Sequence, residues 1–126
     1  MCGIVGIIDH RPSDAKEALL RRMLGLIRHR GPDSFGIYLN DRVGLGSARL
    51  SILDLAGGDQ PIHNEDKTVW IVYNGEVFNY PDLRLELERS GHRFYTKTDT
   101  EILVHLYEDM GPELLSKLNG QFAFAL

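Results

Sequence analysis

The chain opens with two segments whose apolar residues follow different periods. Residues 4–8 form a short continuous apolar run, which predicts a central strand. Residues 15–28 instead place apolar side chains at i, i+3, i+4 and i+7, the spacing of an amphipathic helix. Ser13 or Asp14 is expected to cap the first turn of that helix.

Apolar stretches in the middle of the chain predict a hairpin and one further strand. Residues 35–39 and 43–48 flank a polar pair at 40–41, as the two arms of a β-hairpin do. Residues 68–73 are again mostly apolar, and the Asn-Gly pair at 74–75 is expected to stop that strand.

The last part of the chain alternates helix-like and strand-like segments. In order, the pattern predicts a helix from Pro81 to Gly91, a short strand at 94–97, a helix ending at Met110, a helical stretch at 113–118 and a strand at 121–126. Thr98 and Glu101 have the spacing of a capping box, which predicts that they open the helix ending at Met110.

This interleaved order, with several strands in hairpins, favours mixed sheets with helices on the outside. The length of 126 residues allows one domain with its own core. The chain ends on five consecutive apolar residues, which we interpret as part of a buried strand. Because chain ends are usually polar and exposed, we expect the sequence to be a fragment of a larger protein.

Composition excludes several classes of function. Hydrophobic residues make up 43% and charged residues 25% of the sequence, as in soluble globular proteins. The net charge of −4 argues against a nucleic-acid surface, which is normally basic. No segment approaches the roughly 20 apolar residues of a membrane span, and the first residues lack the basic start of a signal peptide. We therefore expect a cytoplasmic protein.

Candidate chemistry begins at Cys2, the only cysteine, which directly follows Met1. A small second residue allows removal of Met1, which would leave Cys2 with a free α-amine. An α-amine titrates near about 7.7–8.0 and a thiol near about 8.5, so the amine can accept the thiol proton at neutral pH. The alternative is common, because a lone cysteine usually acts as a small buried apolar residue.

Ordered motifs connect the whole chain with a known family. The opening MCGIVGI at residues 1–7 resembles the start of class II glutamine amidotransferases, which are N-terminal nucleophile hydrolases. The later motifs are RHRGPD at 28–33, RLSI at 49–52, QP at 60–61, NGEVFN at 74–79, TDTE at 98–101 and LNGQFAFA at 118–125. Together they resemble the glutaminase domain of glutamine-hydrolysing asparagine synthetases.

The resemblance implies catalytic roles for Cys2, Asn74 and Gly75. Thiol attack on an amide passes through a tetrahedral oxyanion, which needs fixed hydrogen-bond donors. The resemblance assigns that task to the side-chain amide of Asn74 and the backbone N–H of Gly75. The alternative is a plain turn, because Asn-Gly is the strongest short hairpin signal.

Substrate binding is implied for other residues. Arg49 resembles the arginine that holds the α-carboxylate of glutamine, and its alternative is an exposed surface charge. Asp99 resembles the acidic residue that pairs with the α-ammonium group, and its alternative is a favourable charge in the first turn of a helix. Backbone groups of Leu50, Ile52 and Glu76 are expected to line the same pocket.

By this resemblance, residues 1–126 form a glutaminase domain with an α+β fold, an αββα sandwich of mixed, mainly antiparallel sheets truncated at its C-terminal end. Cys2 would hydrolyse glutamine to glutamate and ammonia through a thioester. A C-terminal synthetase domain, absent from this chain, would use ATP and magnesium to convert aspartate to asparagine. Alternatives are another ammonia acceptor, such as a sugar or a carboxylate precursor, and an inactive module with the same fold. No cofactor is expected in this domain, and a homodimer is a further expectation.

Two features of the sequence, the loop at residues 29–33 and the histidines, are assigned no step in the reaction. The loop at residues 29–33 is interpreted as a brace for the N-terminal strand. The five histidines show no tight metal-ligand spacing, so no metal site is predicted. Glu101 and His105, one helical turn apart, are interpreted as an exposed i,i+4 pair.

Overall fold

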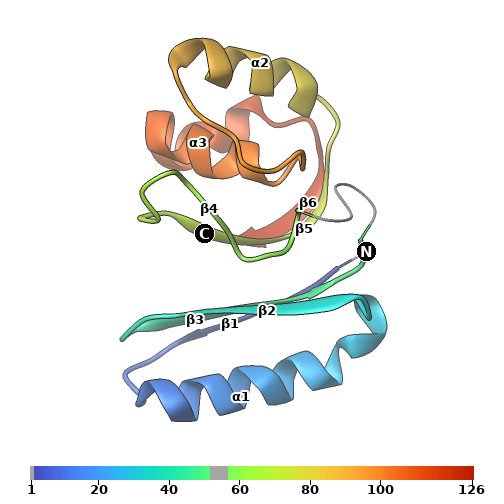
Figure 1. The fold of residues 1–126 in the computed structure, drawn as a ribbon, viewed down its shortest axis with the longest axis vertical. Coiled ribbons are helices and arrows are strands. Elements are labelled where there is room, and N and C mark those ends of the chain that lie inside the picture. Colours follow the sequence, from blue (N-terminus) through green and yellow to red (C-terminus); the bar gives the residue numbers. More distant parts are fainter. Residues whose placement is uncertain (1, 52–56) are drawn as a thin grey trace.

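The computed structural model describes residues 2–51 and 57–126. These residues are arranged in layers in the order helix, sheet, sheet, helices (Figure 1). The outer layers are α1 (Ser13–Leu26) on one side, and α2 (Tyr80–Ser90) and α3 (Glu101–Met110) on the other. The αββα sandwich expected from the resemblance is therefore confirmed.

The first sheet contains the predicted hairpin and the predicted N-terminal strand. That strand lies at the edge of the described sheet, so the prediction of a central strand is wrong. Its strands are β1 (Gly3–Ile8), β2 (Ser34–Leu39) and β3 (Val43–Arg49), in the spatial order β1-β3-β2, and both pairings are antiparallel. The apolar face of α1 packs on β3, where glycines permit a close approach. A Cβ atom on Gly44 would lie 2.7 Å from Cδ1 of the buried Leu20.

The second sheet contains β4 (Ile62–His63), β5 (Trp70–Val77) and β6 (Gly120–Ala125), in the order β4-β5-β6 and again antiparallel. Strand β5 contacts β1 and β3, so the two sheets stack face to face. On the other face of this sheet, apolar side chains of β4 and β5 pack with those of α2 and α3 in the main core. Ile71, Ile102 and Leu103 at its centre are fully buried.

Two short 3₁₀ helices complete the described elements, η1 (Arg28–Arg30) after α1 and η2 (Gly111–Lys117) after α3. The second of these is the predicted helical stretch near residues 113–118. The predicted stop of α2 at Gly91 is also confirmed, because Gly91 has a φ of 106°, which glycine adopts without steric cost.

The predicted helix caps are wrong. Helix α1 begins at Ser13 itself, with Pro12 at the N-cap position, and no described side chain caps it. Helix α3 is present, but Thr100 rather than Thr98 is at its N-cap position. The Glu101 carboxylate accepts hydrogen bonds from the backbone N–H groups of Tyr95 and Thr96, so it holds the preceding segment instead of closing a capping box.

Two strand predictions also fail. Residues 94–97 form no strand in the described structure, because Glu101 holds this segment against α3 rather than at a sheet edge. The Asn-Gly pair does not stop β5, which continues to Val77 and pairs Asn74 with Ala123 and Gly75 with Phe122 of β6. Local turn propensity was overridden by this long-range pairing.

Candidate functional site

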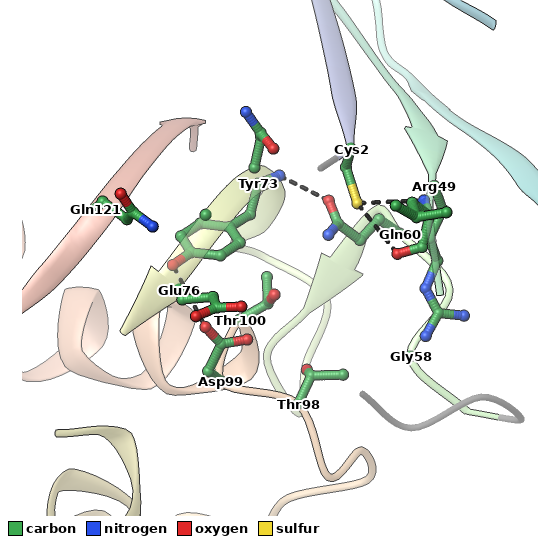
Figure 2. A pocket seen from close by; sticks show the side chains of 13 residues that line it. Cys2, Arg49, Gly58, Gln60, Tyr73, Glu76, Thr98, Asp99, Thr100 and Gln121 are labelled. Atoms are coloured by element: carbon green, nitrogen blue, oxygen red, sulfur yellow. Dashed lines mark hydrogen bonds between the residues drawn. The ribbon is translucent and has the colours of Figure 1, made fainter. Parts of the chain in front are cut away.

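A pocket collects nearly all of the predicted site residues (Figure 2). It is lined from both sheets and from the segment that precedes α3. The predicted residues that line it are Cys2, Arg49, Leu50, Asn74, Gly75, Glu76 and Asp99. The remaining predicted residue, Ile52, lies outside the described residues.

The register of the first sheet positions Cys2. Gly3 pairs with Ala48 in the antiparallel β1–β3 ladder, so the residue before Gly3 comes beside the end of β3. The backbone N–H of Leu50 donates to Cys2 Sγ at 3.4 Å, and the thiol can donate to the Leu50 carbonyl oxygen at 3.7 Å. The thiol is half-buried at the pocket wall, so Cys2 is not a core residue.

The loop at residues 29–33 braces this end of the sheet, as predicted. The guanidinium Nε of Arg30 donates to the carbonyl oxygen of Cys2 at 3.3 Å. The Asp33 carboxylate accepts from the backbone N–H of Ser51 at 2.8 Å. A Cβ atom on Gly31 would collide with the backbone carbonyl of Ala48, so this position requires glycine. The loop thus holds both Cys2 and the residues after β3.

Arg49 is the last residue of β3, and only 5% of it is exposed, so it is not the surface charge that its residue type suggests. Its Nη1 lies 2.9 Å from Oδ1 of Asp59, whose side chain is 70% exposed. A hydrogen bond from Ser34 and the Arg49 guanidinium lower the pKa of Asp59. The guanidinium at the pocket therefore already has one carboxylate beside it.

Asn74 and Gly75 lie in β5, so the plain turn is excluded. The side-chain oxygen of Asn74 is buried and has no hydrogen-bond partner among the described residues. Gly75 has a φ of 157°, and a Cβ atom there would collide with the Gln121 carbonyl oxygen and the backbone of Phe122. The glycine is therefore required by the close approach of β6. The unpartnered atom of Asn74 is its acceptor oxygen, so the donor role implied for its amide nitrogen stays a prediction.

Asp99 comes just before α3 rather than in its first turn, so the helix-charge alternative does not describe it. Its carboxylate accepts from the backbone N–H of Val77 at 2.9 Å and lies 3.4 Å from the Tyr73 hydroxyl, which can donate to it. Burial raises the pKa of Asp99, and the nearby Glu76 carboxylate adds to that effect. A buried carboxylate with this environment favours a cationic partner.

Sequence reasoning missed other residues of the pocket wall. Tyr73 is buried in β5 and was expected only as an apolar strand residue, yet its hydroxyl faces Asp99 (Figure 2). Its backbone N–H donates to Oε1 of Gln60 at 2.6 Å. The QP motif at 60–61 includes Gln60, but it does not predict which contact this residue makes. Thr98, Thr100 and Gln121 also line the pocket.

Taken together, the pocket offers a thiol, a buried guanidinium, a buried carboxylate and an amide on adjacent elements. Opposite charges at Arg49 and Asp99 can recognise a ligand that carries both a carboxylate and an ammonium group. Within the described ranges, no group of three metal-binding side chains lies in this pocket.

Known proteins resemble this chain over its whole length. The profile of the family described as "Glutamine amidotransferase domain" matches residues 1–126. Asparagine synthetase [glutamine-hydrolyzing] 1 of Bacillus subtilis is 46% identical over 129 residues, and asparagine synthetase B [glutamine-hydrolyzing] of Escherichia coli is 43% identical over 128 residues. Both alignments cover 100% of this chain but only 20% and 23% of those proteins, so the chain spans about a fifth of their length.

A solved structure has a similar fold. The glutamine phosphoribosylpyrophosphate amidotransferase of B. subtilis matches with a TM-score of 0.77 at 22% identity, over 96% of this chain and 34% of that chain. At this identity the likeness shows the fold alone. The family profile, in contrast, spans every residue of the sequence. The chain belongs to the glutamine amidotransferase domain family.

Proposed function

We propose that this chain is the glutaminase part of a larger enzyme and hydrolyses glutamine to glutamate and ammonia with Cys2 as its nucleophile. The observation that carries the proposal is the convergence of Cys2, Arg49, Asn74 and Asp99 on one pocket. Glutamine has a carboxylate, an ammonium group and a side-chain amide, which match the guanidinium, the carboxylate and the thiol of that pocket.

The proposed reaction starts from Cys2 as the mature N-terminus, after removal of Met1. The α-amine takes the thiol proton, and the sulfur attacks the amide carbon of glutamine. The Asn74 side-chain amide and the Gly75 backbone N–H stabilise the oxyanion. The intermediate collapses to a γ-glutamyl thioester as the α-ammonium returns its proton to the departing ammonia. Water, deprotonated by the α-amine, then hydrolyses the thioester to glutamate and restores the thiol.

In this proposal, Arg49 and Asp99 each bind one charged group of glutamine. Arg49 holds the α-carboxylate through its guanidinium, and Asp99 holds the α-ammonium group. Tyr73 and Val77 orient the Asp99 carboxylate through its hydrogen bonds. Backbone groups of Leu50, Ile52 and Glu76 complete the pocket.

For the parent protein we propose that ammonia passes to a synthetase domain that converts aspartate to asparagine. The names of the relatives at 40–46% identity support this acceptor. ATP and magnesium would serve that domain, and we assign neither to residues of this chain. No helix in the described residues is long and apolar enough to cross a membrane. Cytoplasmic location and a homodimer remain predictions. Cell fractionation tests the location of the full protein, and sedimentation equilibrium tests its oligomeric state.

The first experiment measures glutamate release by the full-length protein and by Cys2→Ala. We expect the variant to lose glutamine hydrolysis, because alanine removes only the thiol. Asparagine formation from added ammonium, aspartate and ATP should persist in the variant, which shows that the protein is folded and that the acceptor is aspartate. A second variant that retains one extra residue before Cys2 should also be inactive, since it lacks the free base. Comparable glutamate release in all three proteins would exclude Cys2 as the nucleophile.

A further inference from the structure

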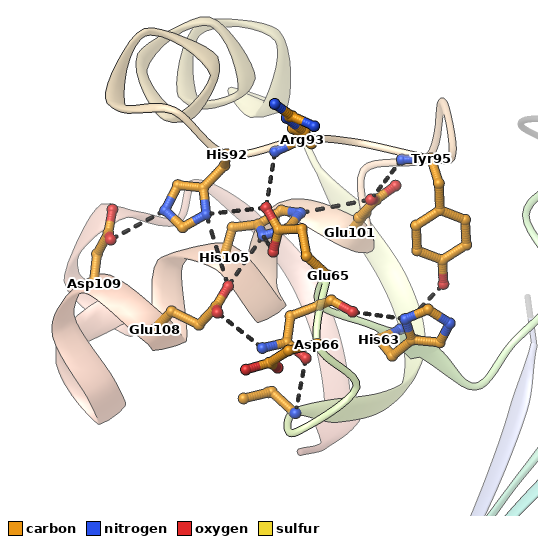
Figure 3. Close-up of polar contacts among 12 residues, drawn as sticks. His63, Glu65, Asp66, His92, Arg93, Tyr95, Glu101, His105, Glu108 and Asp109 are labelled. Carbon is orange, nitrogen blue, oxygen red and sulfur yellow. Dashed lines mark hydrogen bonds and ion pairs between the residues drawn. The ribbon is translucent and has the colours of Figure 1, made fainter.

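A second group of chemically reactive side chains lies away from the pocket, around α3. Glu65 follows β4, His92 follows α2, and His105 and Glu108 are one turn apart on α3 (Figure 3). We call these four residues the α3 cluster; none of them lines the pocket. Their donor atoms all lie within 4.8 Å of one another. The members come from three separate segments, so their spacing in the sequence does not predict this cluster.

The spacing of the donor atoms suits a tetrahedral metal ion. His105 Nδ1 is 3.3 Å from a Glu65 oxygen and 3.2 Å from a Glu108 oxygen. His92 Nδ1 is 3.7 Å from an oxygen of each of the same two carboxylates. Zinc bonds of roughly 2.0–2.1 Å place neighbouring tetrahedral donors about 3.3 Å apart. The wider pairs must draw together on binding, which the solvent-facing Glu65 and Glu108 side chains can do.

Both imidazoles also have a carboxylate at their other nitrogen. His92 Nε2 lies 3.0 Å from Oδ1 of Asp109. His105 Nε2, a buried atom without a hydrogen-bond partner among the described residues, faces Oε1 of Glu101 at 3.5 Å. A carboxylate behind each ligating histidine fixes the ring and its tautomer and raises its basicity, as is usual at zinc sites. In both rings this arrangement leaves Nδ1 directed to the cluster (Figure 3).

The two carboxylates of the α3 cluster are held from outside in the same way. Oε1 of Glu65 accepts from the backbone N–H of Arg93 at 2.8 Å. Oε1 of Glu108 accepts from the side-chain amide of Asn64 at 2.8 Å. In each case the second oxygen, Oε2, faces His105. Carboxylate ligands oriented by outer hydrogen bonds are a further feature of metal sites.

The net charge of the α3 cluster and its neighbours also favours a bound cation. Four carboxylates surround the two imidazoles, from Glu65, Glu101, Glu108 and Asp109. Their ion pairs in the described structure are all with His92 and His105. Even two protonated histidines would leave an excess of negative charge, which a divalent cation would offset.

We propose that the α3 cluster binds one zinc ion through Glu65, His92, His105 and Glu108. Two imidazole nitrogens and two carboxylate oxygens are donors that zinc accepts in tetrahedral geometry, whereas magnesium prefers an octahedral set of oxygens. The ion would join the β4–β5 turn, the α2–α3 connection and α3. Its role is structural, and it is independent of the proposed glutamine hydrolysis.

The test uses the full-length protein, stripped of metal with a chelator and titrated with zinc in excess magnesium. The double variant Glu65→Gln with His92→Gln removes two exposed or half-buried ligands without a large change in volume. The control, His10→Gln with Glu113→Gln, changes the same residue types at exposed positions outside the cluster. We expect the wild type and the control to bind one equivalent of zinc more than the cluster variant.

Cobalt provides a readout of geometry in the same three proteins. Four-coordinate cobalt bound to wild type and control should give an intense visible absorption that the cluster variant lacks. Circular dichroism of the metal-free proteins checks that the double variant is folded. If the double variant is unfolded, the single variant Glu65→Gln is used in its place. Equal zinc stoichiometry and equal cobalt spectra in all proteins would overturn the proposal.

Discussion

Asp99 and Glu101 lie two residues apart on the same segment, yet their carboxylates face opposite regions of the molecule. Asp99 faces the pocket, and burial raises its pKa. Burial would also raise the pKa of Glu101, but the adjacent His105 imidazole and hydrogen bonds from Thr96 and Tyr95 outweigh it and lower that pKa. Both residues are buried, at 6% and 0% exposure, so burial alone does not separate them.

The difference lies in whether the protein itself supplies a partner that can carry a positive charge. Glu101 has His105 at 3.5 Å, whereas Asp99 forms no ion pair within the described residues. A buried carboxylate without a cation costs stability, and this cost is removed when a cationic ligand binds. The comparison therefore supports the proposal that Asp99 binds a ligand, while Glu101 stabilises the fold. The following substitutions test this division, from the largest expected effect to the smallest.

Asn74→Asp replaces the side-chain amide of the proposed oxyanion hole with a carboxylate. An ionised aspartate has no N–H to donate and repels the developing charge. We expect a loss of about 10²–10³ in kcat for glutamine hydrolysis at a temperature where the variant is folded, and a lower melting temperature, because the new carboxylate is buried without a cation. Both quantities should be measured on one full-length preparation. Retained activity would remove Asn74 from the proposed oxyanion hole.

Asp99→Asn removes the carboxylate that has no protein cation. Its Oδ1 can still accept from Val77 and Tyr73, so the fold should persist. Because the folded pKa of Asp99 is raised, its contribution to stability is full below its unfolded pKa of about 3.9 and is lost as pH rises through the folded value. At neutral pH the substitution should therefore leave the melting temperature unchanged or raise it.

The same variant should lose about 10² in kcat/KM for glutamine, since the ammonium group loses its buried partner. In the wild type, kcat/KM should fall as the pH falls through the raised pKa of Asp99, because the neutral carboxyl no longer pairs with the ammonium group. The variant should lack this acidic limb. A pH profile of kcat/KM for both proteins measures it, and identical profiles would contradict the assignment.

Glu101→Gln should lower stability and leave glutamine binding nearly unchanged, which is the reverse of the result expected for Asp99→Asn. Glutamine replaces one acceptor oxygen with an NH₂ group that faces the donors of Thr96 and Tyr95, so the free energy of unfolding should fall by about 1–3 kcal/mol. We expect a lower melting temperature of this domain, measured with a chelator so that bound metal does not add stability. At a temperature where the variant is folded, its KM for glutamine should be within about threefold of the wild-type value. A large KM effect without loss of stability would show that Glu101 acts on the pocket.

Much of the fold followed from local patterns, because β1, the β2–β3 hairpin and α2 have clear periodicity or turn signals. Failures occurred where a distant segment decides the local conformation. The Asn-Gly pair at 74–75 favours a turn, but pairing with β6 extends the strand through it. Glu101 and His105 have the spacing of a surface pair, yet both are fully buried.

The prediction of the candidate site rests on the resemblance of motif residues such as Cys2 and Arg49 to those of a known family, and chemistry explains each of these residues singly. What could not be predicted depends on neighbours that meet only in the folded chain. Tyr73 has the pattern of a core residue, and its hydroxyl gains a role only because Asp99 lies opposite it. The α3 cluster was missed for the same reason.

Asp59→Asn removes the carboxylate beside Arg49 and should have the smallest effect. The exposed Asp59 carboxylate lies 2.9 Å from Nη1 of Arg49, where it would compete with the α-carboxylate of the proposed substrate for the guanidinium. Exposed ion pairs contribute about 0.2–1 kcal/mol, so removing the charge should lower KM for glutamine by roughly 1.5- to 5-fold with kcat unchanged. Asp9→Asn, which breaks the exposed ion pair with Arg11 in the first sheet's outer loop, is the matched control and should leave KM unchanged. If KM rises instead, Asp59 positions Arg49 for the substrate, and Arg49 would then resemble Glu101 more than Asp99, as a charge whose partner belongs to the protein.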